Sequence, residues 1–387
     1  SIETAMLFTH EHDELRRTAK RIVDTHINPF VDEWEEAGEY PAHQVIKVLG
    51  DAGLLGISRP EAYGGLGLDY TYEIVAAEEM GYIAANGVST SVGVQMNMCT
   101  PALAKHGSDD LRETWLRPSI AGDLLGAIGV SEAGSGSDVS SVKTYARRDG
   151  GDYVINGSKM WISNGIQADW ICLLANTSQD NGPHRNKSLI IVPLDAPGIE
   201  RTKLKKLGLH SSDTAQIFFD DVRVPVANRI GEENRGFIYQ MEQFQEERLY
   251  VVARSLGVLD DCIRITMEYT AQRETFGKPV LDHQWVAYHL AEMQVEVTAT
   301  RALLHQAVER YVQGEDVTQL ASMAKYKIGR MSETIPSDCL RFWGGQGFMH
   351  ENRISRIYRD SKLAAIGGGA NEIMLQIIAK NMRKTMV

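Results

Sequence analysis

The spacing of hydrophobic residues changes twice along the chain and divides it into three parts. In the first part, apolar side chains recur every three or four positions, as at Leu15, Ala19 and Ile22, which is the period of an amphipathic helix. We therefore predict an all-helical domain over residues 1–122. Its helices are expected at 11–31, 42–54, 70–106 and 109–121.

From Leu124 the pattern alternates with a period of two, and clusters of Gly, Pro, Asn and Asp separate the apolar runs. This is typical of short β-strands in a small barrel or sandwich. We predict a middle β domain over residues 123–232. Its strands are expected at 124–131, 141–148, 152–156, 170–176, 188–194 and 215–225.

After Gly231 the helical period returns and continues to the end of the chain. Four long segments joined by Gly-rich turns predict an antiparallel four-helix bundle over residues 233–387. The expected helices are 236–271, 282–313, 317–343 and 370–385, and the expected fold class is α+β.

Composition narrows the possible functions. The 387 residues exceed one ordinary core, and 43% hydrophobic with 24% charged residues is typical of a soluble globular protein. A net charge of −11 argues against a nucleic-acid partner. No apolar run is long enough to span a membrane, and we expect no secretion signal. Four cysteines without a CxxC pair predict reduced thiols, an intracellular location and no bound metal.

Two stretches of the middle domain carry candidate chemistry: VSEAGSGSD at 130–138 and MWISNG at 160–165. A hairpin at Asp149–Asp152 is expected to bring them together. Small residues let the backbone approach a flat ligand, hydroxyls bond its heteroatoms, and an indole covers its face. The pattern favours a planar cofactor with a polar edge, but a plain surface loop beside a core Trp explains it equally well.

A candidate base lies on the first bundle helix. Glu247 shares a helical stripe with Phe244 and Val251, where burial would raise its pKa and make it a usable base. A structural ion pair with Arg248 is an equally good interpretation. The adjacent face, expected to be wetter, holds Glu242, Gln243, Glu246 and Tyr250.

The two middle-domain motifs, together with PEAYGGLGL at 60–68 and GGGANEIM at 367–374, resemble the acyl-CoA dehydrogenase family over nearly the whole chain. This resemblance implies the three-domain fold of that family, bound FAD, and α,β-dehydrogenation of an acyl-CoA thioester to the trans-2-enoyl-CoA. It also implies a location in the cytoplasm, or in the mitochondrial matrix of a eukaryote.

One departure from the family points to the base. Most members carry IYEGT in the last loop, where the Glu takes the α-proton, whereas this chain has Gly368 at that position. In the isovaleryl-CoA and long-chain branches of the family, the base lies on the first bundle helix, in a Glu-Arg pair. Glu247 and Arg248 of this chain resemble that pair. The resemblance also implies that the Gly368 N–H and the flavin ribityl hydroxyl polarise the thioester carbonyl.

The resemblance implies further site residues, with Ala133, Arg341 and Ala370 departing from the usual Pro, Gln and Thr. Residues expected to line the flavin of the same chain are Ile128, Val130, Ser131, Ser137, Trp161 and Ser163, with Ala370 and Glu372 in the last loop. Those expected to reach a neighbouring subunit's FAD are Arg273, Phe276, Gln284, Arg341, Gly344 and Gly345. Expected substrate contacts are Ser137, Gln245, Arg248, Gly367, Gly368 and Gly369.

The family also implies partners and a substrate class. A homotetramer built as a dimer of dimers and an electron-transfer flavoprotein as electron acceptor are expected. An acyl-CoA oxidase or a flavin monooxygenase on the same fold is the alternative. Gly367 and Gly368 replace the bulky Tyr-Glu pair that most family members carry beside the acyl group. We therefore expect a larger acyl chain, either branched or medium to long, with a citronellyl-CoA dehydrogenase-like member as one candidate. Inward folding of Tyr239 or Met241 would instead restore a narrow slot.

Overall fold

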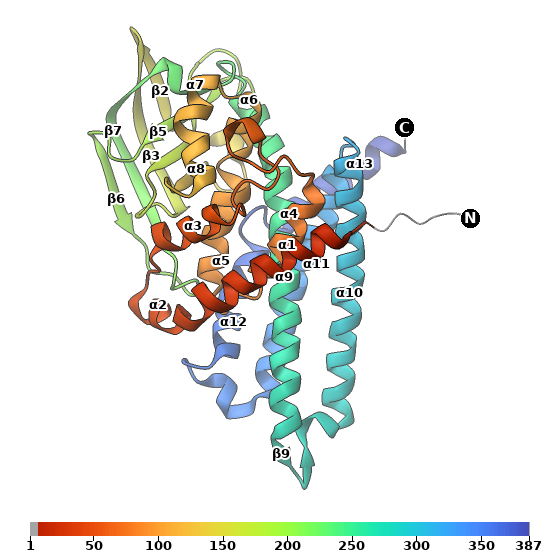
Figure 1. Ribbon diagram of the computed structural model, residues 1–387. Coiled ribbons are helices and arrows are strands. Elements are labelled where there is room, and N and C mark those ends of the chain that lie inside the picture. Colours follow the sequence, from red (N-terminus) through yellow and green to blue (C-terminus); the bar gives the residue numbers. More distant parts are fainter. Residues whose placement is uncertain (1–6, 387) are drawn as a thin grey trace.

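The computed structural model describes residues 7–386 and contains three regions in the predicted order (Figure 1). Short helices of the first region pack beside a β-sheet, and long helices extend away from both. None of the helices between residues 7 and 386 is both long and apolar enough to cross a bilayer. Cys99, Cys172, Cys262 and Cys339 are all buried free thiols, as predicted.

The first region is helical, but its helices are shorter than predicted. The expected helix 70–106 is wrong as one continuous element, because it breaks after Met80. There Gly81 packs against the backbone of the long helix α9 (Gly236–Gln272), and a Cβ on Gly81 would lie 2.2 Å from the carbonyl oxygen of Arg254. The helices are α1 (His10–Ile22), α2 (Val31–Ala37), α3 (Ala42–Asp51), α4 (Tyr70–Met80), α5 (Asn86–Gly93), α6 (Pro101–His106), α7 (Asp109–Leu111) and α8 (Arg117–Ala121).

The middle region forms one sheet with the strand order β6-β7-β3-β2-β4-β5-β8, and β1 pairs with β4. β6 was not predicted, because its residues are mostly exposed and show no apolar alternation. β3 runs to Ser163, well beyond the predicted end at 156. The strands are β1 (Gly126–Gly129), β2 (Tyr145–Asp149), β3 (Asp152–Ser163), β4 (Trp170–Asn176), β5 (Lys187–Pro193), β6 (Ile199–Lys203), β7 (Thr214–Pro225) and β8 (Arg229–Ile230).

The third region contains the four predicted long helices. α9 lies at its centre and packs against α4, α10 and α11, so it joins the first region to the bundle (Figure 1). α12 (Arg353–Ser361) was not predicted, although Asn352 caps its N-terminus by accepting the Ile354 N–H. The other elements are α10 (Gln284–Val312), α11 (Thr318–Phe342), α13 (Asn371–Thr385), β9 (Glu274–Thr275) and β10 (Lys278–Pro279).

Candidate active site

A buried ion pair fixes the loop that follows β1. Lys159, which has no exposed surface, lies 3.0 Å from the Glu132 carboxylate, and its ammonium also donates to the carbonyl oxygen of Val130 at 2.9 Å. The Glu132 carboxylate accepts the backbone N–H groups of Lys143 and Thr144 as well. Burial lowers the pKa of Lys159 to about 8. Sequence reasoning missed this pair, because Glu132 does not stand out within its motif and Lys159 lies just before the second motif.

The two middle-domain motifs meet at Trp161, as predicted. The Met160 N–H donates to the Ser131 carbonyl oxygen at 2.9 Å. A register shift between Lys159 and Ile162 produces a bulge in β3, and Trp161 there has φ +58° and is 54% exposed. A bulky residue with positive φ is strained, and such residues concentrate at functional sites. The alternative interpretation of Trp161 as a core residue is therefore wrong.

The remaining residues of this loop leave a surface that fits a flat cofactor. Ile128 and Ser163 are half-buried, whereas Ser137 is exposed on the loop. A Cβ on Gly134 or Gly136 would have no atom within 4 Å, so a ligand can approach the backbone closely there. An exposed indole, a loop hydroxyl and open glycines together can bind a flat ligand with a polar edge.

Glu247 lies against the glycine loop that precedes α13. Its Oε1 atom is 3.4 Å from the point where a Cβ of Gly368 would lie, so the Glu247 carboxyl borders the gap left by the missing side chain. Gly368 and Gly369 have φ values of +66° and +102°, which favour glycine. Within residues 7–386, nothing forms a hydrogen bond or ion pair with the Glu247 side chain. Burial raises its pKa to about 7.

Arg248 follows Glu247 but does not pair with it. Its side chain is buried, and the guanidinium carbon lies 6.0 Å from the centre of the Phe244 ring. Across the described part of the chain, Arg248 Nε has no hydrogen-bond partner. The structure thus lacks the ion pair offered as the alternative role of Glu247. The side chain of Gln245, a predicted substrate contact, donates to Thr318 Oγ1 at the start of α11, at 3.2 Å.

The face of α9 that we expected to be exposed to solvent is largely buried, so that prediction was wrong. Gln243 and Tyr250 are buried, and the Glu246 carboxylate lies 3.0 Å from the guanidinium of Arg59, which is only 3% exposed. The Tyr311 hydroxyl donates to the same carboxylate at 3.2 Å. The prediction failed because α9 has packing partners on several sides, so the periodicity of its own sequence could not identify a solvent face.

Tyr239 does not fold toward the glycine loop, so this part of the narrow-slot alternative is wrong. Its ring stacks on His106 with centroids 4.1 Å apart, and its hydroxyl accepts the Glu232 N–H at 3.2 Å. A Cβ on Gly367 would contact Leu363 at 3.3 Å. Of the two glycines, only Gly368 is therefore the one whose missing side chain adjoins Glu247.

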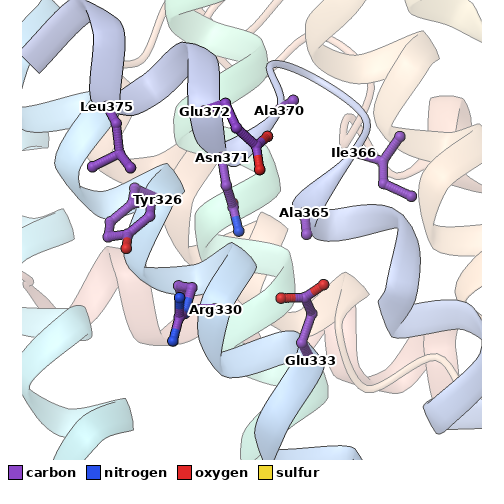
Figure 2. A pocket seen from close by; sticks show the side chains of 9 residues that line it. All are labelled: Tyr326, Arg330, Glu333, Ala365, Ile366, Ala370, Asn371, Glu372 and Leu375. Atoms are coloured by element: carbon purple, nitrogen blue, oxygen red, sulfur yellow. The ribbon is translucent and has the colours of Figure 1, made fainter.

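A cavity of about 330 Å³ lies next to the glycine loop, between α11 and α13 (Figure 2). Ala370 and Glu372, both predicted cofactor residues, line it together with Arg330 of α11. The Asn371 Oδ1 atom is buried there and has no partner among the described residues. This atom packs against Gly329 of α11, so the polar lining of the cavity is provided by Arg330, Glu333 and Glu372.

Six predicted cofactor residues lie away from this cavity. Figure 1 shows the β9–β10 hairpin at the end of α9 farthest from the sheet. Phe276 at its tip is 98% exposed, and the Arg341 guanidinium lies 5.3 Å from the ring centre of Trp285 near the start of α10. This chain does not bring the six together with Trp161; they are Arg273, Phe276, Gln284, Arg341, Gly344 and Gly345.

Comparison with known proteins gives consistent matches over nearly the whole length. Family models described as "Acyl-CoA dehydrogenase" match as N-terminal domain at 9–123, middle domain at 127–222 and C-terminal domain at 234–383. The long-chain specific acyl-CoA dehydrogenase of Rattus norvegicus is 35% identical, covering 97% of this chain and 87% of that protein.

Solved structures agree with these matches. The crystal structure of an acyl-CoA dehydrogenase from Geobacillus kaustophilus superposes with a TM-score of 0.93 at 36% identity, covering 98% of this chain and 100% of that one. A glutaryl-CoA dehydrogenase from Mycobacterium smegmatis, solved in complex with FADH2, superposes with a TM-score of 0.90 at 28% identity, covering 98% and 96%.

Proposed function

This chain belongs to the acyl-CoA dehydrogenase family and is an enzyme of that class, and from this premise we propose that it uses FAD and Glu247 to convert an acyl-CoA thioester into the trans-2-enoyl-CoA. The observation that carries the proposal is the position of the Glu247 carboxyl. It lies beside Gly368, the position that resembles the site of the catalytic Glu in most family members. It has no ion-pair partner in the part of the chain described here.

Proton transfer is the step that Glu247 performs in this proposal. A carboxyl with a pKa of about 7 is partly ionised at neutral pH and matches a general base working there. Its ionised oxygen accepts the α-proton of the thioester. The pKa follows from burial, which Arg248 and Lys325 oppose because their positive charges favour the carboxylate.

Polarisation of the thioester carbonyl is assigned to the glycine loop. Between residues 7 and 386, the N–H of Gly368 donates to no acceptor, so it is free to bind a developing oxyanion. The positive φ of Gly368 is a backbone conformation that the loop can adopt readily because the residue is glycine. The thioester carbonyl must be polarised in this way, because the α-C–H is otherwise far too weakly acidic to lose its proton to a carboxylate.

The cofactor is assigned to the surface around Trp161. Ser131, Ser137 and Ser163 supply hydroxyl and backbone groups, and the bulge in β3 turns the indole outward. When bound there, FAD would supply the acceptor for the hydride that leaves the β-carbon. The cavity beside Ala370 and Glu372 suits a polar portion of the same cofactor.

A second copy of the chain completes the cofactor site in this proposal. Arg273, Phe276 and Gln284 are exposed and lie in or next to the β9–β10 hairpin, at the end of α9 farthest from the sheet, which leaves them available to a second copy. The family resemblance implies that the copies form a homotetramer built as a dimer of dimers. We further propose an electron-transfer flavoprotein as acceptor and an intracellular location, in agreement with four buried free thiols.

The proposed substrate is a branched or a medium to long acyl-CoA. Its support is the gap at Gly368 and the name of the long-chain relative. Butyryl-CoA should then lose rate as well as affinity, because its short chain uses less binding energy to position the α-carbon.

Anaerobic bleaching of the flavin by butyryl-, octanoyl-, isovaleryl- and citronellyl-CoA tests both levels of the proposal. Bleaching by at least one of them supports dehydrogenation, and bleaching by none refutes it. A clear preference for butyryl-CoA in kcat/KM refutes the proposed substrate class alone. Peroxide release during aerobic turnover would favour the oxidase or monooxygenase alternative.

A further inference from the structure

Lys325 of α11 is fully buried beneath the glycine loop. Its ammonium donates to the carbonyl oxygen of Ala364 at 2.6 Å and to that of Gly369 at 3.1 Å. One carbonyl precedes the three glycines and the other belongs to the last of them. A single side chain therefore holds both ends of the segment that carries the Gly368 N–H.

The same lysine borders Glu247. Its Cε atom is 3.7 Å, and the Glu247 Oε1 atom 3.4 Å, from the point where a Cβ of Gly368 would lie. The charged groups around Glu247 are Lys325 and Arg248, while Arg254 of α9 acts on Lys325. Both cations next to Glu247 lower its pKa against the larger effect of burial.

A buried ammonium is costly, because two hydrogen bonds do not replace its hydration. Burial lowers the pKa of Lys325 to about 8, so it is still mostly charged at neutral pH. A purely structural role explains the two hydrogen bonds to the loop. It does not explain why the charge lies beside a carboxyl that has no ion-pair partner in the described residues.

We propose that Lys325 is a positioning residue for the dehydrogenation: its hydrogen bonds orient the Gly368 N–H, and its charge stabilises the ionised form of Glu247. This inference rests on the proposed function, because it assumes that Glu247 is the base. Lys325 touches neither the substrate nor the cofactor in this role and acts through the loop and the carboxylate.

The test compares Lys325→Met with Lys325→Arg in the holoenzyme. Lys327→Met is the matched control, because Lys327 is a partly exposed residue of the same helix that pairs with Glu296. The rate of flavin bleaching is measured between about pH 5.5 and 9, where a base of this kind titrates. Infrared difference spectra of the resting holoenzyme follow the Glu247 carboxyl directly, and its band is assigned by its loss in Glu247→Gln.

Loss of a nearby charge typically shifts a carboxyl pKa by about 1 unit or more. We therefore expect Lys325→Met to move the acidic limb of the profile and the infrared titration upward by about 1 unit. The rate then falls about tenfold more at pH 6 than at high pH, where a smaller, pH-independent loss from the missing hydrogen bonds to the loop remains. Lys325→Arg and Lys327→Met should retain the acidic limb of the unmodified enzyme.

An unshifted limb and infrared band in Lys325→Met overturn the inference, and so does an equal loss of rate at every pH. Normal bleaching by Glu247→Gln would instead refute the base assignment itself, so the two failures are distinguishable. If Lys325→Met fails to fold, Lys325→Gln, which keeps N–H donors without the charge, gives the same comparison.

Discussion

Replacement of Glu247 by Gln is the most direct test of the proposed chemistry. The amide has the volume of the carboxyl, so the close approach to Gly368 is preserved while the proton acceptor is lost. Removal of a general base typically costs about 10²- to 10⁴-fold in rate. We expect the upper part of this range, because the neighbouring carboxylate cannot take over: Glu246 is turned toward Arg59 and bound to it.

The assay is single-turnover bleaching of the flavin by the best acyl-CoA of the panel. Glu242→Gln is the matched control, because Glu242 lies on the same helix and pairs with Lys105 and His106 at the surface. Glu246→Gln is unsuitable as a control, since it would leave the buried Arg59 unpaired. The control should bleach normally, and both variants should retain FAD and thermal stability. A rate for Glu247→Gln within about tenfold of the unmodified enzyme would refute the assignment.

Three further outcomes follow from the charges in the structure. The bleaching rate should rise as the pH increases through about 7, because Glu247 accepts a proton only when ionised; a flat profile would contradict this. Glu246→Gln should lower the free energy of unfolding by about 2–3 kcal/mol in denaturant titrations, somewhat less than the usual cost of breaking a buried ion pair, because Arg59 keeps its bonds to Thr100 and Met96. Stability equal to that of Glu242→Gln would argue against this cost. Glu132→Gln should weaken FAD retention during gel filtration, because it leaves Lys159 unpaired beneath the loop; unchanged flavin content would show that the pair does not shape the site.

The sequence alone determined the class of each region and the motifs of the site. Periods of 3.6 and 2 separate helices from strands because they report which side of each element is buried, and they identified the four long bundle helices. The absence of a side chain at Gly368 and the presence of Glu247 could also be connected through the family resemblance. β6 was missed because it carries too little apolar pattern, and α12 was missed because its apolar positions, Ile354 and Ile357, span less than one helical turn of a nine-residue helix.

Only the tertiary structure decided which charges are buried together. Glu246 with Arg59, Glu132 with Lys159, and Lys325 beneath the glycine loop each join residues that are far apart in the sequence. A helix wheel assumes one buried face and one solvent-exposed face, but α9 is enclosed by neighbours from all three regions of the chain. Solvent access and electrostatic partners are therefore set by long-range packing, and they in turn determine the pKa of Glu247.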